Sequence, residues 1–229
     1  MTPVSFLPQA VLFDMDGLLL DSERAIIACW REAAAELQVD VDDALWFRMI
    51  GMHEKDYVPL MRRTLSEDQV AGLREGCYSR YQQRIETGIG LHAHVREVLD
   101  DLQVRGMPRA VVTSTRRERA LHKLRTSRIA QYFGVVVTGS DVAEPKPAPE
   151  GYLKAAAALG VDAARCVVFE DSAFGVRAAL AAGMTPIQVP DVVVPDEATR
   201  ALGHRIVANL AEGYALIGPR MTERGPDAG

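Results

Sequence analysis

Short apolar runs that alternate with helical patterns constrain the fold of this chain more than any other feature. The first run covers residues 10–14 and is apolar up to its final acid, Asp14. Such a run is typical of a strand that is buried on both faces of a parallel sheet. Similar runs cover residues 109–113, 135–138, 166–169 and 186–189. Strands that alternate with helices predict a doubly wound, Rossmann-like α/β sheet.

Helical patterns fill the gaps between these runs. Residues 94–105 repeat apolar side chains at helical spacing, and Gly106 follows as a C-terminal stop. The stretches 116–126, 150–159 and 173–182 fit the same scheme. We expect these helices to cover the sheet.

The interval between the first two predicted strands is too long for a single crossover. Residues 22–38 carry apolar side chains at helical spacing, and Ser66 begins a capping-box pattern ahead of a second helical stretch. We therefore predict a cap of about four or five helices inserted at residues 22–90. The core would comprise residues 1–21 and 91–229, with the cap over the end of the first strand.

Composition argues against several classes of function. The net charge of -5 and the pI of about 5.6 argue against nucleic acid as a partner, because its binding relies on clustered Lys and Arg. No stretch approaches the ~20 apolar residues of a membrane span, and residues 1–9 lack the pattern of a signal peptide. The three cysteines are far apart, which favours buried thiols in a reducing compartment. We expect a cytoplasmic protein; the sequence does not determine its oligomeric state, for which a monomer is the expectation.

Polar side chains gather where the predicted strands end, which is where ligands bind in a doubly wound sheet. The residues at these ends and in one nearby loop are Asp14, Asp16, Thr113, Ser114, Lys146, Glu170 and Asp171. Acids at this density repel one another unless a cation is present, and Mg²⁺ prefers carboxylate, water and phosphate oxygens. Hydroxyls and a lysine can bind a phosphate. The set therefore predicts magnesium-dependent phosphoryl transfer.

Asp14 and Asp16 need separate roles in such a reaction. Gly17 permits a sharp turn that lets both carboxylates point into one site. One acid can attack phosphorus, and the other can protonate the leaving alcohol and then deprotonate the attacking water. Taken alone, each acid could be a turn or cap residue. The other motifs favour chemistry.

The chain resembles the haloacid dehalogenase (HAD) superfamily over nearly its whole length. The likeness rests on four ordered motifs: Phe-Asp-Met-Asp-Gly at residues 13–17, a strand ending in Thr113, Lys146 ahead of a helix, and the pair Glu170-Asp171. It is similar to the group with an α-helical cap that includes β-phosphoglucomutase and many sugar- and nucleotide-phosphate phosphatases. The resemblance implies hydrolysis of a small phosphorylated metabolite, such as a sugar or nucleotide phosphate, through an aspartyl-phosphate intermediate.

The resemblance also implies a set of metal ligands. Asp14 would be both the nucleophile and a magnesium ligand. Asp16 would be the general acid/base and would bind the metal through its backbone carbonyl. Asp171 would ligate Mg²⁺ directly, with support from Glu170.

For the substrate, the resemblance implies ligands from the core and from the cap. Thr113 and the Ser114 backbone would hold the phosphoryl group, and Lys146 would neutralise charge between it and the nucleophile. The cap loop that inspects the substrate would contain Arg48 and His53.

Two alternative functions stay open. A phosphomutase would use the same core chemistry, but β-phosphoglucomutase has a His shortly after the nucleophile and a cap Arg for a second phosphate. The matching positions here are Ile26 and Glu54. A signalling module that is phosphorylated on aspartate also combines acids, a hydroxyl and a Lys, yet such modules are much shorter and carry the acceptor on a middle strand. Both comparisons favour the hydrolase.

Overall fold

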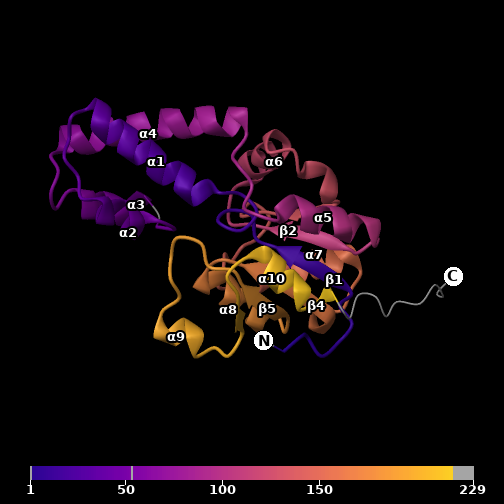
Figure 1. The fold of residues 1–229 in the computed structure, drawn as a ribbon. Coiled ribbons are helices and arrows are strands. Elements are labelled where there is room, and N and C mark those ends of the chain that lie inside the picture. Colours follow the sequence, from indigo (N-terminus) through magenta and orange to yellow (C-terminus); the bar gives the residue numbers. More distant parts are fainter. Residues whose placement is uncertain (1, 53, 219–229) are drawn as a thin grey trace.

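A parallel sheet forms the centre of the molecule. The computed structural model describes residues 2–52 and 54–218, and within them a six-stranded sheet has the order β3-β2-β1-β4-β5-β6 (Figure 1). Every pairing between neighbouring strands is parallel. The strands are β1 (Ala10–Phe13), β2 (Arg109–Val112), β3 (Val135–Val137), β4 (Cys166–Glu170), β5 (Thr185–Gln188) and β6 (Arg205–Ile206). The predicted α/β fold is thereby confirmed.

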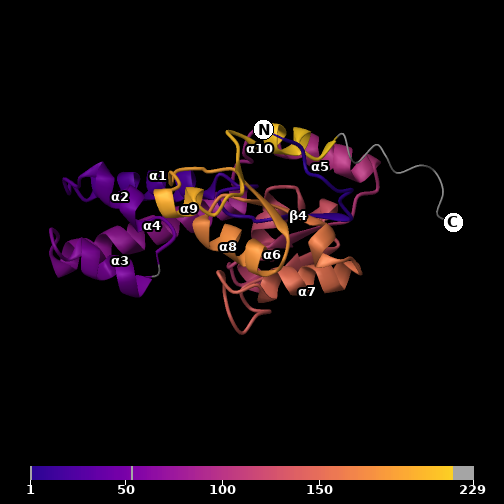
Figure 2. The same cartoon turned by 90° about the horizontal axis from the view of Figure 1, so that it is seen from below.

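Helices cover both faces of the sheet, which explains why its strands are apolar runs. Alternate residues of β1 pack into two separate hydrophobic clusters. The first cluster contains buried side chains of α5 (Val95–Val104) and α10 (Leu210–Ala215). The second contains those of α7 (Glu150–Leu159) and α8 (Ala173–Ala181). Figure 2 shows these two pairs of helices on opposite sides of the strands.

A group of helices interrupts the chain between β1 and β2. It consists of α1 (Ser22–Glu36), α2 (Asp43–Met49), α3 (Glu54–Met61) and α4 (Glu67–Thr87). In Figure 1 these helices stand to one side of the sheet, and the rest of the chain forms the core around it. We call helices α1–α4 the cap.

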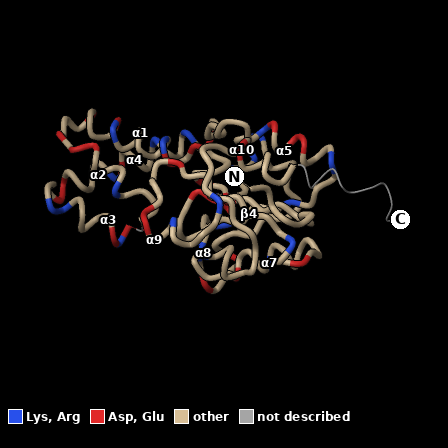
Figure 3. Tube along the Cα trace, turned by 60° about the horizontal axis from the view of Figure 1, so that its bottom comes forward, with Lys and Arg blue, Asp and Glu red and all other residues tan. Residues whose placement is uncertain are grey.

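Stacked rings and surface ion pairs hold the cap together. Trp30 of α1 stacks on Trp46 of α2, with 5.4 Å between the ring centroids and an interplanar angle of 6°. Arg84 of α4 forms an ion pair with Glu32 of α1 at 2.5 Å. Figure 3 shows charges of both signs interspersed along the cap helices. The cap thus has its own small apolar interior and a polar outer surface.

Helix α4 begins with the capping box that the sequence predicts. The Ser66 side chain accepts a hydrogen bond from the Gln69 amide at 3.3 Å, and the Gln69 side chain accepts one from the Ser66 amide at 2.9 Å. Two of the amides that a helix N-terminus leaves free are satisfied in this way.

The two segments of chain that connect the cap to the core run next to each other. The Asp21 amide donates to the Gly90 carbonyl at 2.9 Å, and the His92 amide donates to the Leu19 carbonyl at 3.1 Å. The first and last residues of the cap therefore lie next to each other. Hinge motions are absorbed at a few such loop residues, so any movement of the cap is expected to take place at this paired linker.

The cysteines and helices add two findings. Cys29, Cys77 and Cys166 are buried free thiols, as predicted. Within the described ranges, we find no helix whose length and apolar character would let it cross a membrane.

Candidate active site

Asp14 and Gly17 shape the turn that follows β1. The Asp14 amide donates to the Phe169 carbonyl of β4 at 3.0 Å, so the Asp14 carboxylate emerges at the carboxyl end of the sheet. Gly17 has a φ of 83°, and a Cβ atom there would collide with the Asp171 carboxylate. The turn therefore requires glycine. It brings the loop after β1 against the acid that follows β4.

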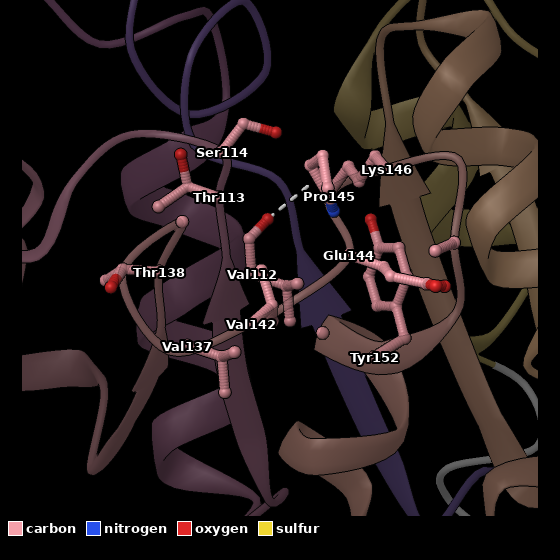
Figure 4. A pocket seen from close by; sticks show the side chains of 13 residues that line it. Val112, Thr113, Ser114, Val137, Thr138, Val142, Glu144, Pro145, Lys146 and Tyr152 are labelled. Atoms are coloured by element: carbon pink, nitrogen blue, oxygen red, sulfur yellow. Dashed lines mark hydrogen bonds between the residues drawn. The ribbon is translucent and has the colours of Figure 1, made fainter.

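Lys146 joins the ends of three strands. Its ammonium donates to Asp14 Oδ1 at 2.5 Å and to Glu170 Oε1 at 2.5 Å. It also donates to the Val112 carbonyl of β2 at 2.9 Å (Figure 4). Burial lowers the pKa of Lys146, but Asp14 and Glu170 raise it more, so its pKa lies well above the ordinary value. A permanent cation is thus held beside Asp14.

Glu170 is fully buried and is satisfied by protein donors. Besides Lys146, the Tyr152 hydroxyl of α7 donates to Oε1 at 2.7 Å. The side chain and the amide of Ser172 donate to Oε2 at 3.0 and 3.2 Å. In this arrangement Glu170 orients Lys146, and its expected support of a metal stays a prediction. The sequence analysis missed Tyr152, which reads there as an ordinary core residue of a helix.

Three acids at this end of the sheet, Asp14, Asp171 and Glu23, have raised pKa values. Burial raises the pKa of Asp14 to about 7, against the lowering effect of Lys146. Burial and then repulsion from Asp14 raise the pKa of Asp171 well above its ordinary value. Burial and the surrounding acids also raise the pKa of Glu23 to about 8. The sequence analysis missed Glu23, because an acid in the first turn of a helix is ordinary.

The acid cluster has the chemistry of a magnesium site. Asp14 and Asp171 offer the hard carboxylate oxygens that Mg²⁺ binds. Burial is the main cause that raises both pKa values, and repulsion from Asp14 is the next cause for Asp171. A divalent cation there would favour the ionised form of both carboxylates. The donor set therefore fits the predicted ion.

Asp16 is held by two side chains that lie far away in the sequence. Lys123 of α6 (Arg117–Thr126) donates to Oδ1 at 2.7 Å, and the Thr115 hydroxyl donates to Oδ2 at 2.7 Å. Although burial raises the pKa of Asp16, the charge and hydrogen bond of Lys123 lower it below its ordinary value. Lys123 itself is only 4% exposed. The sequence analysis missed both partners, because only the fold brings them to Asp16.

Thr113 and Ser114 lie together at the end of β2 (Figure 4). The Thr113 side chain is buried, and its oxygen accepts a hydrogen bond from the Thr115 amide at 3.1 Å. The hydroxyl proton of Thr113 is thus left to donate to a ligand. Ser114 is exposed. Both residues line the same pocket as Lys146, and their binding of a phosphate stays a prediction.

Neither of the two predicted cap ligands, Arg48 and His53, is seen at the cleft in the described part of the chain. Arg48 is exposed on α2 and does not line the cleft described below, so its role in substrate binding stays a prediction. His53 lies outside the described residues. Ile26 lines the cleft, and Glu54 forms an ion pair with Arg74 of α4.

A cleft of about 300 Å³ lies between the cap and the core. Asp16, Glu23 and Lys123 form its charged end, and residues of the four cap helices and of the segment 50–52 form the rest. A substrate whose reacting group meets Asp14 and Asp16 would extend its other end into this cleft. Thr113 and Lys146, the predicted phosphate ligands, line a separate pocket.

Similar sequences occur among bacterial phosphatases. A phosphorylated carbohydrates phosphatase from Thermotoga maritima is 32% identical over 210 residues, which cover 91% of this chain and 90% of that protein. A fructose-1-phosphate phosphatase from Escherichia coli is 29% identical over 188 residues, which cover 78% of this chain and 95% of that protein.

Solved structures show the same architecture. A HAD family hydrolase from Deinococcus radiodurans, with bound phosphate and sodium, superposes with a TM-score of 0.79 at 31% identity and covers 93% of this chain and 96% of its own. CbbY from Rhodobacter sphaeroides, in complex with phosphate, superposes with a TM-score of 0.68 at 27% identity and covers 90% and 96%.

The family model of the haloacid dehalogenase-like hydrolases matches residues 11–189. That span begins within β1, ends just after β5 and includes each core residue to which the sequence analysis assigns chemistry, from Asp14 to Asp171. With this match and the similarity along the chain, the resemblance becomes an assignment: the chain is an enzyme that belongs to the haloacid dehalogenase-like hydrolase family.

Proposed function

We propose that this enzyme hydrolyses small phosphomonoesters, with Asp14 as the nucleophile and Mg²⁺ as the cofactor. The observation that carries the proposal is the setting of Asp14: Lys146 lies at 2.5 Å, and acids of raised pKa crowd the same space. This setting suits phosphoryl transfer, in which positioning and charge neutralisation supply most of the catalysis. The phosphatases of phosphorylated carbohydrates and of fructose 1-phosphate among similar proteins support a sugar phosphate as substrate.

The reaction would proceed in two steps through Asp14. A carboxylate oxygen of Asp14 attacks phosphorus and the bond to the leaving oxygen breaks. That oxygen takes its proton from Asp16, which has to be in its acid form for this step although Lys123 favours its carboxylate. The phosphoryl group then sits on Asp14 as an acyl phosphate. Asp16 takes a proton from water and the water oxygen attacks phosphorus. The bond between phosphorus and the Asp14 oxygen breaks, which releases inorganic phosphate and restores the Asp14 carboxylate. Lys123 and Thr115 hold the Asp16 carboxylate in place for both proton transfers.

Three groups would bind the phosphoryl oxygens. The Thr113 hydroxyl and the Ser114 backbone reach them from the end of β2, and Lys146 reaches them from the loop before α7. Lys146 is oriented by Glu170, so its charge stays in place when the substrate arrives.

The carboxylates of Asp14 and Asp171 and the backbone carbonyl of Asp16 would hold Mg²⁺. When bound, the ion would supply positive charge against the phosphoryl oxygens. Glu170 would support this ion only indirectly, because its carboxylate oxygens already accept from protein donors.

The phosphomutase alternative finds little support in the cap. Ile26, in place of the His, has no ionisable side chain. Glu54, in place of the Arg, is an acid that already forms an ion pair with Arg74. Neither residue can hold a second phosphate. The signalling alternative has no support from the family match, because the matching family is one of hydrolases.

The substitution Asp14→Asn tests the proposal. With Mg²⁺ and para-nitrophenyl phosphate, we expect turnover to fall at least about a thousandfold, because an amide does not attack phosphorus. Asp43→Asn changes an exposed acid of α2 and is the matched control. Acid quenching of the native enzyme during turnover should trap phosphate on Asp14. An unchanged rate in Asp14→Asn contradicts the assignment of the nucleophile.

A further inference from the structure

The cleft between the cap and the core has two chemically different ends. The end next to the core, which we call the core end, carries Asp16 and Lys123 of the core and Glu23 from the first turn of α1. The cap end is apolar and mostly aromatic, and its main residues are Trp30, Trp46, Met49, Met52 and Tyr57. Since the core end meets the reacting phosphate, the cap end receives whatever the phosphate is attached to.

The apolar end is a rigid surface. Trp30 and Trp46 are stacked on each other, and Tyr57 meets Trp30 edge-on, with 6.0 Å between the centroids. The side chains of both tryptophans are almost wholly buried, so the rings are fixed by their neighbours. A ligand with an apolar face can pack on such a surface without first ordering it.

The only cation at the charged end, among the residues that the structure describes, is Lys123, and it is already paired. Lys123 Nζ lies 2.7 Å from Asp16 Oδ1 and 5.2 Å from the centre of the Tyr81 ring, and its side chain is 5% exposed. Among the described residues, no other Lys or Arg lines the cleft. A second anionic group on the substrate would lose part of its water in the apolar end of the cleft and would find no free positive charge there.

We infer that the alcohol released by this enzyme is uncharged and presents an apolar face to the cap, and that esters with a second phosphate or a carboxylate on that alcohol are poor substrates. The inference rests on the proposed function, because it concerns the leaving group of the hydrolysis. The C–H face of a sugar ring or an alicyclic ring has the required chemistry. An open-chain acid or a bisphosphate does not.

Three alkyl esters with similar leaving alcohols test the inference. Glycerol phosphate and phosphoglycerate differ by one hydroxymethyl group in place of a carboxylate, and cyclohexyl phosphate offers an apolar ring. We expect kcat/KM to be highest for cyclohexyl phosphate and at least about tenfold lower for phosphoglycerate than for glycerol phosphate. A value for phosphoglycerate equal to or above that for glycerol phosphate overturns the inference about charge. A value for cyclohexyl phosphate below that for glycerol phosphate overturns the inference about the apolar face.

A cation introduced into the apolar end should relax the discrimination. Met52 is 39% exposed at the edge of the cleft, so Met52→Arg can be made without disturbing the buried rings. We expect it to reduce the preference for glycerol phosphate over phosphoglycerate by about threefold, the effect of a partly exposed ion pair. Val104→Arg, on the exposed side of α5, is the control and should leave the ratio unchanged. An unchanged ratio in Met52→Arg contradicts the charge argument.

Failure of the inference and failure of the proposed function give different results. An enzyme that releases phosphate from para-nitrophenyl phosphate and prefers phosphoglycerate is a phosphatase with a different leaving group. An enzyme that releases phosphate from none of the esters with Mg²⁺ contradicts both proposals.

Discussion

Asp16 illustrates how much of the site depends on single residues from distant parts of the chain. Its position two residues after Asp14 is evident in the sequence, but its carboxylate is held by Thr115 and Lys123. We expect Asp16→Asn to lower kcat by about a hundredfold to ten-thousandfold, the usual contribution of a general acid or base. Mg²⁺ binding should persist, because the expected ligand is the backbone carbonyl. Steady-state kinetics and a magnesium titration check both parts, and full activity would refute the proton-transfer role.

Asp171 offers a test through stability. Its pKa in the folded chain lies above the ordinary value, mainly because of burial, so ionisation of this group destabilises the fold. The stability it contributes is complete below about pH 4 and is lost as the pH rises through the folded pKa. In the presence of a chelator, Asp171→Asn should therefore melt a few degrees above the native protein at about pH 8 and show a smaller difference at about pH 5.

Thermal unfolding monitored by circular dichroism measures this difference. Asp40→Asn replaces an exposed acid and should shift the melting temperature little at either pH. With Mg²⁺ present, the native protein should gain stability and Asp171→Asn should not. A variant that is less stable than the native protein at the higher pH, with the chelator, would show that the acids of the cluster do not strain the fold.

At the scale of elements, the capping box of α4 should be worth a measurable part of the stability. Ser66→Ala removes the acceptor of the Gln69 amide and is expected to lower the free energy of unfolding by about 1 kcal/mol. Ser79→Ala, on the exposed middle of the same helix, is the control and should be neutral or slightly stabilising. Urea titration gives both values, and equal losses would mean that the box does not contribute.

The elements that the sequence reveals are those with a strong apolar period. The helix predicted over residues 150–159 matches α7, and β1 was predicted one residue longer than it is. The strand β6 was missed because its two residues, Arg205 and Ile206, form no apolar run. Periodicity shows that an element is buried, so an element that is short and half-exposed leaves no such signal.

The residues of the site also fall into those that the sequence predicts and those that it does not. Strand ends predict that the acids, the hydroxyls and Lys146 meet, because parallel strands end at one edge. Lys123 and Tyr152 could not be predicted, since each reaches the site from the body of a helix. Their importance depends on how α6 and α7 are rotated against the sheet, and the sequence periodicity of a helix does not specify which polar group meets a distant acid.

At the scale of the whole molecule, one contact ties the cap to the core beside the paired linker. Arg24 in the first turn of α1 donates to Asp191, which follows β5 and whose side chain is 3% exposed. The Arg24 guanidinium also lies 3.3 Å from Asp21, and His92 Nε2 lies 3.5 Å from the other oxygen of Asp191. A movement of the cap would therefore have to break the contacts of buried Asp191 with Arg24 or His92, or carry these residues along.

Removing Arg24 should be more harmful than removing Asp191. Arg24→Ala leaves a carboxylate that is buried without its cation, and we expect the free energy of unfolding to fall by about 1–3 kcal/mol. Asp191→Ala takes away the charge that needs a partner, so its effect should be smaller. Arg31→Ala, which breaks an exposed pair with Asp43, is the control and should cost less than about 1 kcal/mol.

The double variant decides whether the two residues act as a pair. If Asp191 is destabilising only when Arg24 is missing, Arg24→Ala together with Asp191→Ala should be about as stable as Asp191→Ala alone. Hydrogen exchange should show faster opening of the linker in Arg24→Ala than in the double variant, because an unpaired buried acid is relieved when the linker opens to water. Losses that simply add would mean that Arg24 stabilises the cap through its own packing and not through its charge pair with Asp191.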